Sequence, residues 1–416
     1  MGLPWLGAVT ALMLAIRAGS LPQDDALYGR VTTTDGEVVE GYLRWDRNEA
    51  GRSDFLDGRK EIPIEYIREA ERLDPDFAAA QQEARSLVAF GMRITWDEDD
   101  QADPPTEEAS IRLAHVASIT VVDRRSATIE LRSGGTVELA STSSDLGRGM
   151  RGLEVTRPDG SVRSFRWGEL ARVDLLPVPA GVPALGAWRL HGTVSTWSGL
   201  ELEGIIAWDL DEVLTTDILD GRQNGEDYEI EFADISEIAR ETRRSARVVL
   251  QSGDTLVLRG TNDVDRDNRG IEVSDPSFGR AVVPWEDFRW VRFDPAEGSA
   301  SGRDFRPGDP IVGTVFARDG RVLEGRIRWG NVQEQLWESL RGWVDDTRLT
   351  LEFGAMSAVR RIDEDRLEVS LVDGRVFELD VAGEPEGRRP GIFVTPEGRA
   401  TRLVRWQDLD RVELSR

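Results

Sequence analysis

The sequence predicts an all-β protein made of three tandem repeats. One phrase with a central glycine occurs three times, as EVVEGYLRWD at 37–46, ELEGIIAWD at 201–209 and VLEGRIRWG at 322–330. Residues 29–59 and 192–222 align without gaps and are identical at 14 of 31 positions. Apolar and polar residues alternate in these phrases, so each copy is expected to form half-buried strands.

Each repeat has two unequal halves. A second phrase follows the first in every copy, at 124–139, 243–258 and 364–379. A tryptophan-led phrase ends every copy, at 166–175, 284–293 and 405–414. Segments rich in proline and glycine separate the copies, as is usual for linkers. We therefore expect the three repeats to occupy residues 27–176, 188–295 and 311–416.

Only the first repeat carries an insert, which is expected at residues 60–110. Asp74 suits a helix N-cap, Pro75 suits a first turn and Gly91 suits a helix stop, so the sequence predicts a helix between them. The stretch TWDEDDQADPPTEEAS follows as an acidic loop. The first repeat is thus expected to contain a helical and acidic insertion in an otherwise β structure.

Each half is expected to contain five short strands. In repeat 3, GTVFARDGRVLEGRIRW reads as strand, Asp-Gly turn and strand, because Asp and Gly tolerate the positive φ of a two-residue turn. A glycine in the middle of the second strand permits a sharp bend. A third strand follows, and then two short strands flank a single tight turn.

This order of strands resembles the SH3-like small barrels, and the pattern DGxxxxGxLxW from Asp35 to Trp45 resembles their Sm-like branch. The resemblance implies two small five-stranded barrels in each repeat. Sm-like proteins bind RNA through an Asn after the second strand and an Arg-Gly pair before the last strand. No Arg-Gly pair precedes the closing strand here, and Asp211 and Val332 stand where the first copy has Asn48. RNA binding is therefore not implied.

The alternative fold is a six-bladed β-propeller, because six halves would also supply six four-stranded blades. The unequal halves, the linkers and the extra closing strand favour tandem barrels over this alternative.

Composition and charge restrict the possible partners. The formal net charge is −25, which repels phosphate backbones and argues against a nucleic acid partner. The absence of cysteine excludes disulfides and thiolate metal sites. Residues 1–20 contain a short apolar run followed by small residues, which predicts a signal peptide and an exported protein, periplasmic or extracellular. No transmembrane segment is expected in the mature chain.

The candidate metal ligands are carboxylates. Asp97 and Asp99 belong to the densest acidic cluster, and Asp263, Asp265 and Asp267 are spaced like the start of an EF-hand calcium loop. The later positions of that loop, Asn268 and Ser274, do not match the calcium motif. Solvated acidic loops are the competing interpretation. Calcium is the metal that these carboxylates would suit, and no other cofactor is expected.

Tryptophans recur at fixed places in every repeat and are therefore expected to pack in the core. These six residues are Trp45, Trp208, Trp329, Trp167, Trp285 and Trp406. Tryptophans outside the pattern are candidates for a platform that stacks on sugars or peptides, namely Trp188, Trp197, Trp290, Trp337 and Trp343.

The sequence contains no convincing catalytic motif. His115 and His191, which are the two histidines, lie in different repeats and are not expected to form a triad. A G-x-G-x-x-G pattern at 147–152 is followed by a strand rather than a helix, so it is expected to be a loop and not a nucleotide site.

These observations favour an exported acidic repeat protein that acts as a non-enzymatic binding or scaffold module of the bacterial cell envelope. Its partner would be a protein or an envelope component. One alternative is a carboxylate-dependent hydrolase of envelope polymers, which needs a rigid pair of carboxylates in a concave site. Another is a structural protein stabilised by calcium.

Overall fold

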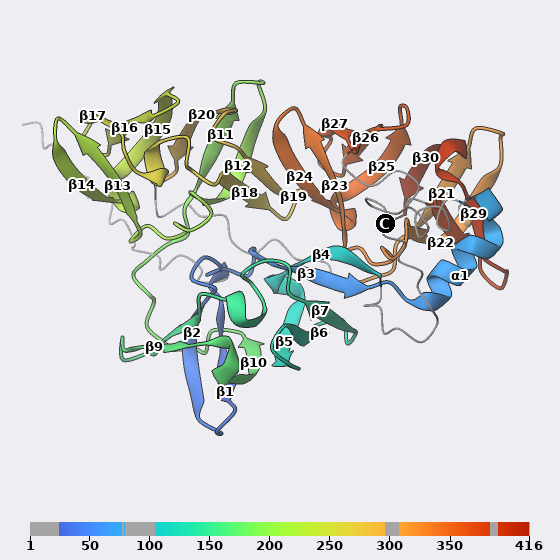
Figure 1. The fold of residues 1–416 in the computed structure, drawn as a ribbon, viewed down its shortest axis with the longest axis horizontal. Coiled ribbons are helices and arrows are strands. Elements are labelled where there is room, and N and C mark those ends of the chain that lie inside the picture. The colour runs from blue at the N-terminus through green and yellow to red at the C-terminus, as the bar shows by residue number, and fades with distance from the viewer. Residues whose placement is uncertain (1–24, 77–78, 80–104, 296–307, 383–389, 416) are drawn as a thin grey trace, which may run out of the picture.

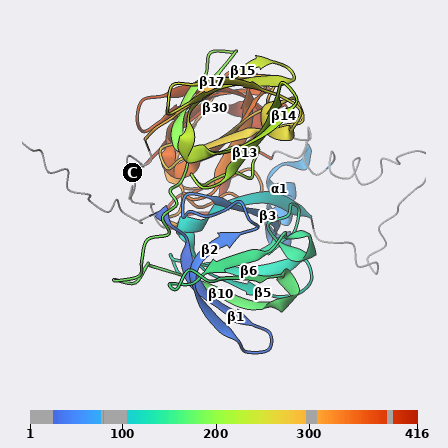
Figure 2. The same ribbon diagram turned by 90° about the vertical axis from the view of Figure 1, so that its left-hand side faces the viewer.

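The computed structural model of the chain describes residues 25–76, 79, 105–295, 308–382 and 390–415, and it is all-β as the sequence predicts. We call the parts before residue 177, from 188 to 295 and from 308 onward the first, second and third segments. The first segment (blue to green) packs against one side of a row formed by the other two (Figures 1 and 2). Within the described residues, no helix is both long enough and apolar enough to span a membrane.

The first segment forms one ten-stranded antiparallel sheet in the order β4-β3-β7-β6-β5-β10-β1-β2-β8-β9. Its strands are β1 (Tyr28–Thr33), β2 (Val38–Trp45), β3 (Phe55–Glu61), β4 (Thr106–Arg112), β5 (Val116–Val121), β6 (Ser126–Leu131), β7 (Thr136–Ala140), β8 (Leu153–Thr156), β9 (Val162–Phe165) and β10 (Leu170–Leu176).

The second and third segments share an 18-stranded sheet, while β13 and β14 pair separately. The strands of the second segment are β11 (His191–Thr196), β12 (Glu201–Ala207), β13 (Ile218–Gln223), β14 (Glu226–Glu231), β15 (Ile235–Thr242), β16 (Ser245–Leu250), β17 (Thr255–Leu258), β18 (Ile271–Asp275), β19 (Gly279–Val283) and β20 (Phe288–Phe293). Those of the third are β21 (Val312–Ala317), β22 (Val322–Trp329), β23 (Ser339–Val344), β24 (Thr347–Glu352), β25 (Met356–Arg361), β26 (Arg366–Leu371), β27 (Val376–Asp380), β28 (Ile392–Thr395), β29 (Arg402–Val404) and β30 (Leu409–Leu414).

The two halves of each segment exchange strands. In the first segment the hairpin β1–β2 continues into β8 and β9 of the other half, and β10 returns to β1. The hairpin β6–β7 meets β3 and β4 of the first half, and β5 returns to β6. The third segment repeats this plan, with β22 on β28 and β27 on β23. Each hairpin is therefore completed by three strands from the opposite half.

This pairing corrects the sequence-based expectation of separate five-stranded barrels. Among the described residues no sheet closes into a barrel, because β4 and β9 remain at the two ends of the first-segment order. The six-bladed propeller is not supported either, since the strands join into sheets of ten and 18 rather than into six separate blades. Neither half of the first segment contains all the strands that its hairpin pairs with, because β8 lies on β2 and β3 lies on β7.

Paired glycines allow this close crossing of strands. Gly29 and Gly41 lie opposite each other in β1 and β2. A Cβ atom would come within 2.4 Å of the Asp174 carbonyl oxygen at Gly29, and within 2.3 Å of the Thr156 carbonyl oxygen at Gly41. Neighbouring backbones thus occupy the space of both missing side chains, which explains why the pair recurs as Gly192 with Gly204 and as Gly313 with Gly325.

Two of the recurring tryptophans hold a loop from the other half of the same segment by a hydrogen bond. The side chain of Trp45 is fully buried and its Nε1 donates a hydrogen bond to the Asp145 carbonyl oxygen at 2.8 Å. Trp208 makes the equivalent bond to Asp263 at 2.9 Å. Trp329, Trp167 and Trp285 are also buried, whereas Trp406 is half-buried. An indole that fills the core and donates one hydrogen bond suits a position where a polar loop crosses apolar strands.

Helix α1 (Ile64–Leu73) joins the insert of the first segment to the third segment. Ala70 packs against Phe393, and Tyr66 Oη donates to Glu334 Oε2 at 2.8 Å. Glu69 pairs with the buried Arg328 at 2.6 Å. This helix precedes the one expected after Asp74, most of which lies outside the described residues, as do residues 1–20.

The second and third segments are joined edge to edge, and the first segment is anchored across their junction. Strand β19 pairs with β24, and the hydrophobic core runs without interruption through both segments. Arg112 at the end of β4 is fully buried and donates to Glu352 Oε2 at 3.0 Å. It also donates to the carbonyl oxygens of Ser53 at 2.6 Å and Gly279 at 3.2 Å.

Candidate functional site

An acidic residue caps the same loop in all three segments, and a cation from another segment neutralises it. In the second segment, Asp217 Oδ2 accepts hydrogen bonds from the backbone N–H groups of Val213 at 2.8 Å and Leu214 at 3.0 Å. Its partner Arg44 comes from β2 of the first segment, with Nη1 and Nη2 at 2.8 and 2.9 Å from the two carboxylate oxygens. Such a two-point guanidinium–carboxylate contact fixes the relative position of both segments.

The other two caps follow the same rule. Asp54 and Glu338 occupy the positions that align with Asp217, and each accepts two loop N–H groups with one carboxylate oxygen. Their partners also come from elsewhere in the chain and lie within ion-pair distance. The three cross-segment pairs are Asp217 with Arg44, Asp54 with Arg189, and Glu338 with Lys60.

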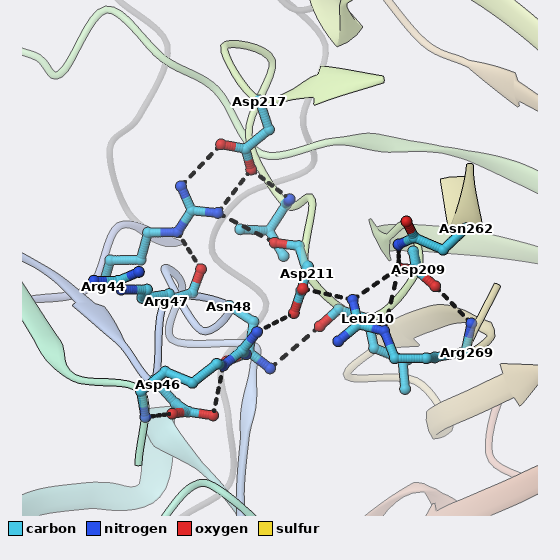
Figure 3. Close-up of polar contacts among 12 residues, drawn as sticks. Arg44, Asp46, Arg47, Asn48, Asp209, Leu210, Asp211, Asp217, Asn262 and Arg269 are labelled. Carbon is cyan, nitrogen blue, oxygen red and sulfur yellow. Dashed lines mark hydrogen bonds and ion pairs between the residues drawn. The ribbon is translucent and has the colours of Figure 1, made fainter. Parts of the chain in front are cut away.

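Two equivalent turns face each other between the first and second segments (Figure 3). They follow Trp45 and Trp208, and positive φ angles of 46° at Asp46 and 50° at Asp209 begin both. Asn48 Nδ2 donates to the Leu210 carbonyl oxygen across the contact at 3.3 Å. The contact therefore joins corresponding turns of the first and second segments.

Two equivalent arginines converge on one carboxylate at this contact. Arg151 binds Asp46 of its own segment, and Arg269 binds Asp209 in the same way. Both guanidinium groups also reach Asp211, with Arg269 Nη2 at 2.5 Å from Asp211 Oδ2 (Figure 3). These partners, despite its partial burial, hold the pKa of Asp211 below its usual range.

Beside this contact lies a compact group of three carboxylates from the second segment. One oxygen atom from each of Asp209, Glu212 and Asp263 lies within 4.8 Å of the others. Asp209 already binds Arg269 at 2.8 Å, and Asp263 Oδ2 accepts the Asp220 N–H at 2.7 Å. The buried Oε2 atom of Glu212 has no hydrogen-bond partner among the described residues.

Burial raises the pKa values of two members of this group. The pKa of Glu212 rises to about 9, mainly through desolvation and then through the charges of Asp263 and Asp209. The pKa of Asp263 rises to about 6, again mainly through desolvation. A proton on Glu212 is therefore the simplest way to reduce the negative charge of the group at neutral pH.

The first segment contains a counterpart made of Asp46, Glu49 and Asp145. Burial and the charge of Asp145 raise the pKa of Glu49 well above its usual value. Burial and the charge of Asp57 raise the pKa of Asp145 to about 7. Glu49 is 8% exposed and its Oε2 atom also has no partner among the described residues.

The donors of these groups are all oxygen, which suits a hard cation such as Ca²⁺. Asp209, Glu212 and Asp263 would hold it, and the cation would displace the proton of Glu212. Calcium prefers six or more oxygen ligands, whereas Asp209 and Asp263 are already engaged in hydrogen bonds. The group is therefore a candidate cation site in which a proton is the competing occupant.

The sequence-based metal ligands are distributed differently in the structure. Asp263 groups with Asp209 and Glu212, and not with the other members of the EF-hand-like pattern. Asp265 Oδ1 accepts the Asp267 N–H at 2.9 Å within its own loop, and the Asp267 side chain is 74% exposed beside Arg266. Asp97 and Asp99 lie outside the described residues.

A second group consists of His191, Glu203 and Asp294 at the surface of the second segment. His191 Nδ1 lies 2.7 Å from Asp294 Oδ2, next to a cavity of about 30 Å³ that Arg189 and Phe232 help to line. That volume suits a water-sized group and not a polymer substrate. His115 lies elsewhere, 3.6 Å from Glu352 Oε1, so the two histidines share no site.

Sequence reasoning identified some of these positions and missed others. Asp54, Asp217 and Glu338 align in the sequence, because each lies nine residues after the tryptophan of its glycine-centred phrase. The group around Glu212 was missed, although the repeated W-D-x-x-E pattern at Trp45 and Trp208 marks two of its three members in both segments. The tryptophans outside the repeated pattern differ from one another in exposure: Trp197 is 57% exposed, whereas Trp337 is buried.

In comparisons with known proteins, no family model, no curated protein and no solved structure matches this chain.

Proposed function

We propose that the chain is an exported, non-enzymatic scaffold or binding module of the bacterial cell envelope, built from tandem repeats. Each repeat would contain two units that resemble open SH3-like small barrels with exchanged strands. The order of pairing supports this likeness: in β1, β2, β8, β9 and β10 the last strand returns to the first after one tight turn. The likeness concerns architecture and implies no RNA binding.

The observation that carries the scaffold function is the set of three cross-segment pairs. Each capping carboxylate stabilises a loop in its own segment and binds a cation from a different part of the chain. Because bidentate or buried ion pairs fix orientation as well as distance, three such contacts favour one rigid body. A rigid elongated body with a net charge of −25 is suited to holding partners apart or together.

The hydrolase alternative is less well supported. Asp209 and Asp263 are 0% and 4% exposed, so a glycan or peptide chain has no access to both carboxylates. Glycoside hydrolysis requires two carboxyl groups that flank a bound sugar in an accessible cleft. In this group the acids instead support a turn and a neighbouring strand.

Calcium stabilisation remains the second candidate function, because Glu212 offers a buried and unpartnered oxygen to the Asp209, Glu212 and Asp263 group. The test is thermal unfolding of the full chain in calcium titrations, with magnesium as the control cation. A calcium-specific rise of the melting temperature that Glu212→Gln abolishes would favour a metal site. An unchanged melting temperature in the wild-type chain would favour a protonated Glu212.

Export and partner binding can be tested in a bacterial host. A chain with a C-terminal affinity tag is expressed with residues 1–20 present or deleted, and each cell fraction is analysed by intact mass. We expect a shortened chain in the periplasm or medium, and retention in the cytosol after the deletion. An uncut cytosolic chain would contradict export. Release of fragments from purified envelope polymers, if Glu212→Gln abolished it, would contradict the non-enzymatic assignment.

A further inference from the structure

The join between the second and third segments is an edge-to-edge strand pairing inside the chain. Strand β19 runs antiparallel to β24, with Arg280 opposite Thr350, Ala281 opposite Leu349 and Val282 opposite Arg348. At the start of this pairing Gly279 lies so close to β24 that a Cβ atom would meet the Thr350 carbonyl oxygen at 2.1 Å. The chain therefore already uses one edge-to-edge docking mode.

The strand that corresponds to β19 in the first segment is β9. In its own segment, each of β9 and β19 follows the strand that pairs with the strand ending in tryptophan. Phe165 of β9 lies opposite Leu153, and Val283 of β19 lies opposite Ile271 in the same way. The strand that corresponds to β24 in the second segment is β14, which pairs with β13 as β24 pairs with β23. Within the described part of the chain, the outer edges of β9 and β14 carry no further strand.

These two edges differ in charge. On β9, Val162 is 59% exposed and Arg163 and Ser164 are also exposed. Strand β14 reads EDYEIE and exposes four acidic side chains. Two copies of β14 would repel each other, since like charges on facing strands are unfavourable. Strand β9 has no acidic side chain and one basic side chain, Arg163, whose Nη2 also lies 3.1 Å from Glu37 Oε2, so β9 suits β14 better than a second acidic strand does.

We infer that β9 of one copy of this protein pairs antiparallel with β14 of a second copy, in the mode of β19 and β24. The inference rests on the proposed scaffold function and names its partner. The corresponding register places Val162 opposite Glu229, Arg163 opposite Tyr228 and Ser164 opposite Asp227. Strands β9 and β14 both lie toward the left-hand side of Figure 1. Because the two paired edges differ, the pairing would join copies of the protein as a closed dimer or as an open chain.

The pairing is short, and it begins one residue later than the internal one because Ser161 stands where the second segment has Gly279. Its partners are charged, so the association is expected to weaken as salt screens them. Acidic edge strands also occur as a defence against such pairing. The experiment therefore has to identify which residues of β9 and β14 lie opposite each other, and not only the mass of the assembly.

The absence of cysteine permits a clean cross-linking test. A Val162→Cys chain is mixed with a Glu229→Cys chain at low salt and oxidised. Residues directly opposite in an antiparallel sheet have Cα atoms about 4.5–5.5 Å apart, within the Cα range of disulfides. The matched control is Val162→Cys mixed with Glu226→Cys, because Glu226 is also exposed on β14 but three residues away. We expect several-fold faster formation of the mixed dimer with Glu229→Cys, and loss of this difference at high salt.

Sedimentation velocity of the unmodified chain supplies the second measurement. A concentration-dependent rise in mass at low salt that Glu229→Arg removes supports the inference, whether the product is a dimer or a longer chain. Equal cross-linking of the test and control pairs, or a monomer at all soluble concentrations, overturns it. A monomer that is exported and captures another envelope protein would leave the proposed function intact. A cytosolic or hydrolytic chain would refute that function whatever its oligomeric state.

Discussion

Asn48 and Asp211 occupy equivalent positions in the two facing turns, and they carry an amide and a carboxylate respectively. Asn48 donates to the Leu210 carbonyl oxygen, and Asp211 accepts Arg151 and Arg269. This difference makes the contact asymmetric and limits the negative charge at the junction. Two carboxylates here would add negative charge beside Asp46 and Asp209, which already use the same arginines.

Replacing the amide should therefore weaken the junction. Asn48→Asp removes the donor to Leu210 and leaves a carboxylate at a position whose buried Oδ1 atom has no partner within the part of the chain that the structure describes. Loss of a buried hydrogen bond in this setting costs about 1–3 kcal/mol. We expect a lower free energy of unfolding in urea, with a larger loss at pH 8 than at pH 5. The conservative Asn48→Gln keeps a neutral amide and serves as the control; an equal loss at both pH values would contradict the electrostatic explanation.

The cross-segment caps predict measurable coupling between distant residues. A double-mutant cycle of Arg44→Met and Asp217→Asn should give a coupling free energy of about 1–2 kcal/mol, because the contact is bidentate and partly buried. The control cycle uses Arg222 and Asp227, whose side chains are 63% and 74% exposed, and should give a value near zero. Chemical denaturation measures both cycles. Similar coupling in the two would mean that the cap does not hold the segments together.

The anchor of the first segment should be sensitive to the loss of one partner. Arg112→Met leaves Glu352 buried without its main counter-charge, which costs about 3–5 kcal/mol in comparable buried pairs. Burial would raise the pKa of Glu352, but Arg112 and His115 outweigh it and hold that pKa below its usual range. The pair therefore adds stability above the unfolded pKa and loses it as the pH falls through the folded pKa.

The double variant Arg112→Met with Glu352→Met should recover much of the lost stability, because no uncompensated charge remains. Thermal unfolding across acidic and neutral pH compares the three chains. Only the wild-type chain, which retains the pair, should lose its contribution in acid. Equal destabilisation by the single and double variants would indicate that Arg112 acts mainly through its backbone contacts.

Glu212 predicts the opposite pH dependence. Its pKa is about 9 in the folded protein against 4.5 in the reference state, so the folded chain binds this proton more tightly. The contribution of this group to stability is complete below about pH 4.5 and declines as the pH rises toward 9. Glu212→Gln should therefore raise the melting temperature at pH 8 and leave it nearly unchanged at pH 4. Glu226→Gln, on an exposed edge, is the control, and an identical response of both variants would refute the buried-proton interpretation.

The sequence predicted the all-β class because alternation and turn residues are local signals. It also marked Trp45 as a repeated position, although not the loop carbonyl of Asp145 to which Trp45 donates. Strand exchange was not predictable, since β2 presents the same pattern of side chains whether β3 or β8 lies beside it. The partner of Asp217 was equally hidden, because Arg44 lies 173 residues away and β2 is its only local context.

Strand exchange also sets the smallest piece of this protein that can exist alone. A cut between β5 and β6 would separate each hairpin from the strands that complete it, and would leave two fragments with open seams. A truncation that keeps each hairpin with its completing strands must therefore keep the whole segment, and the second and third segments also share one sheet and one core.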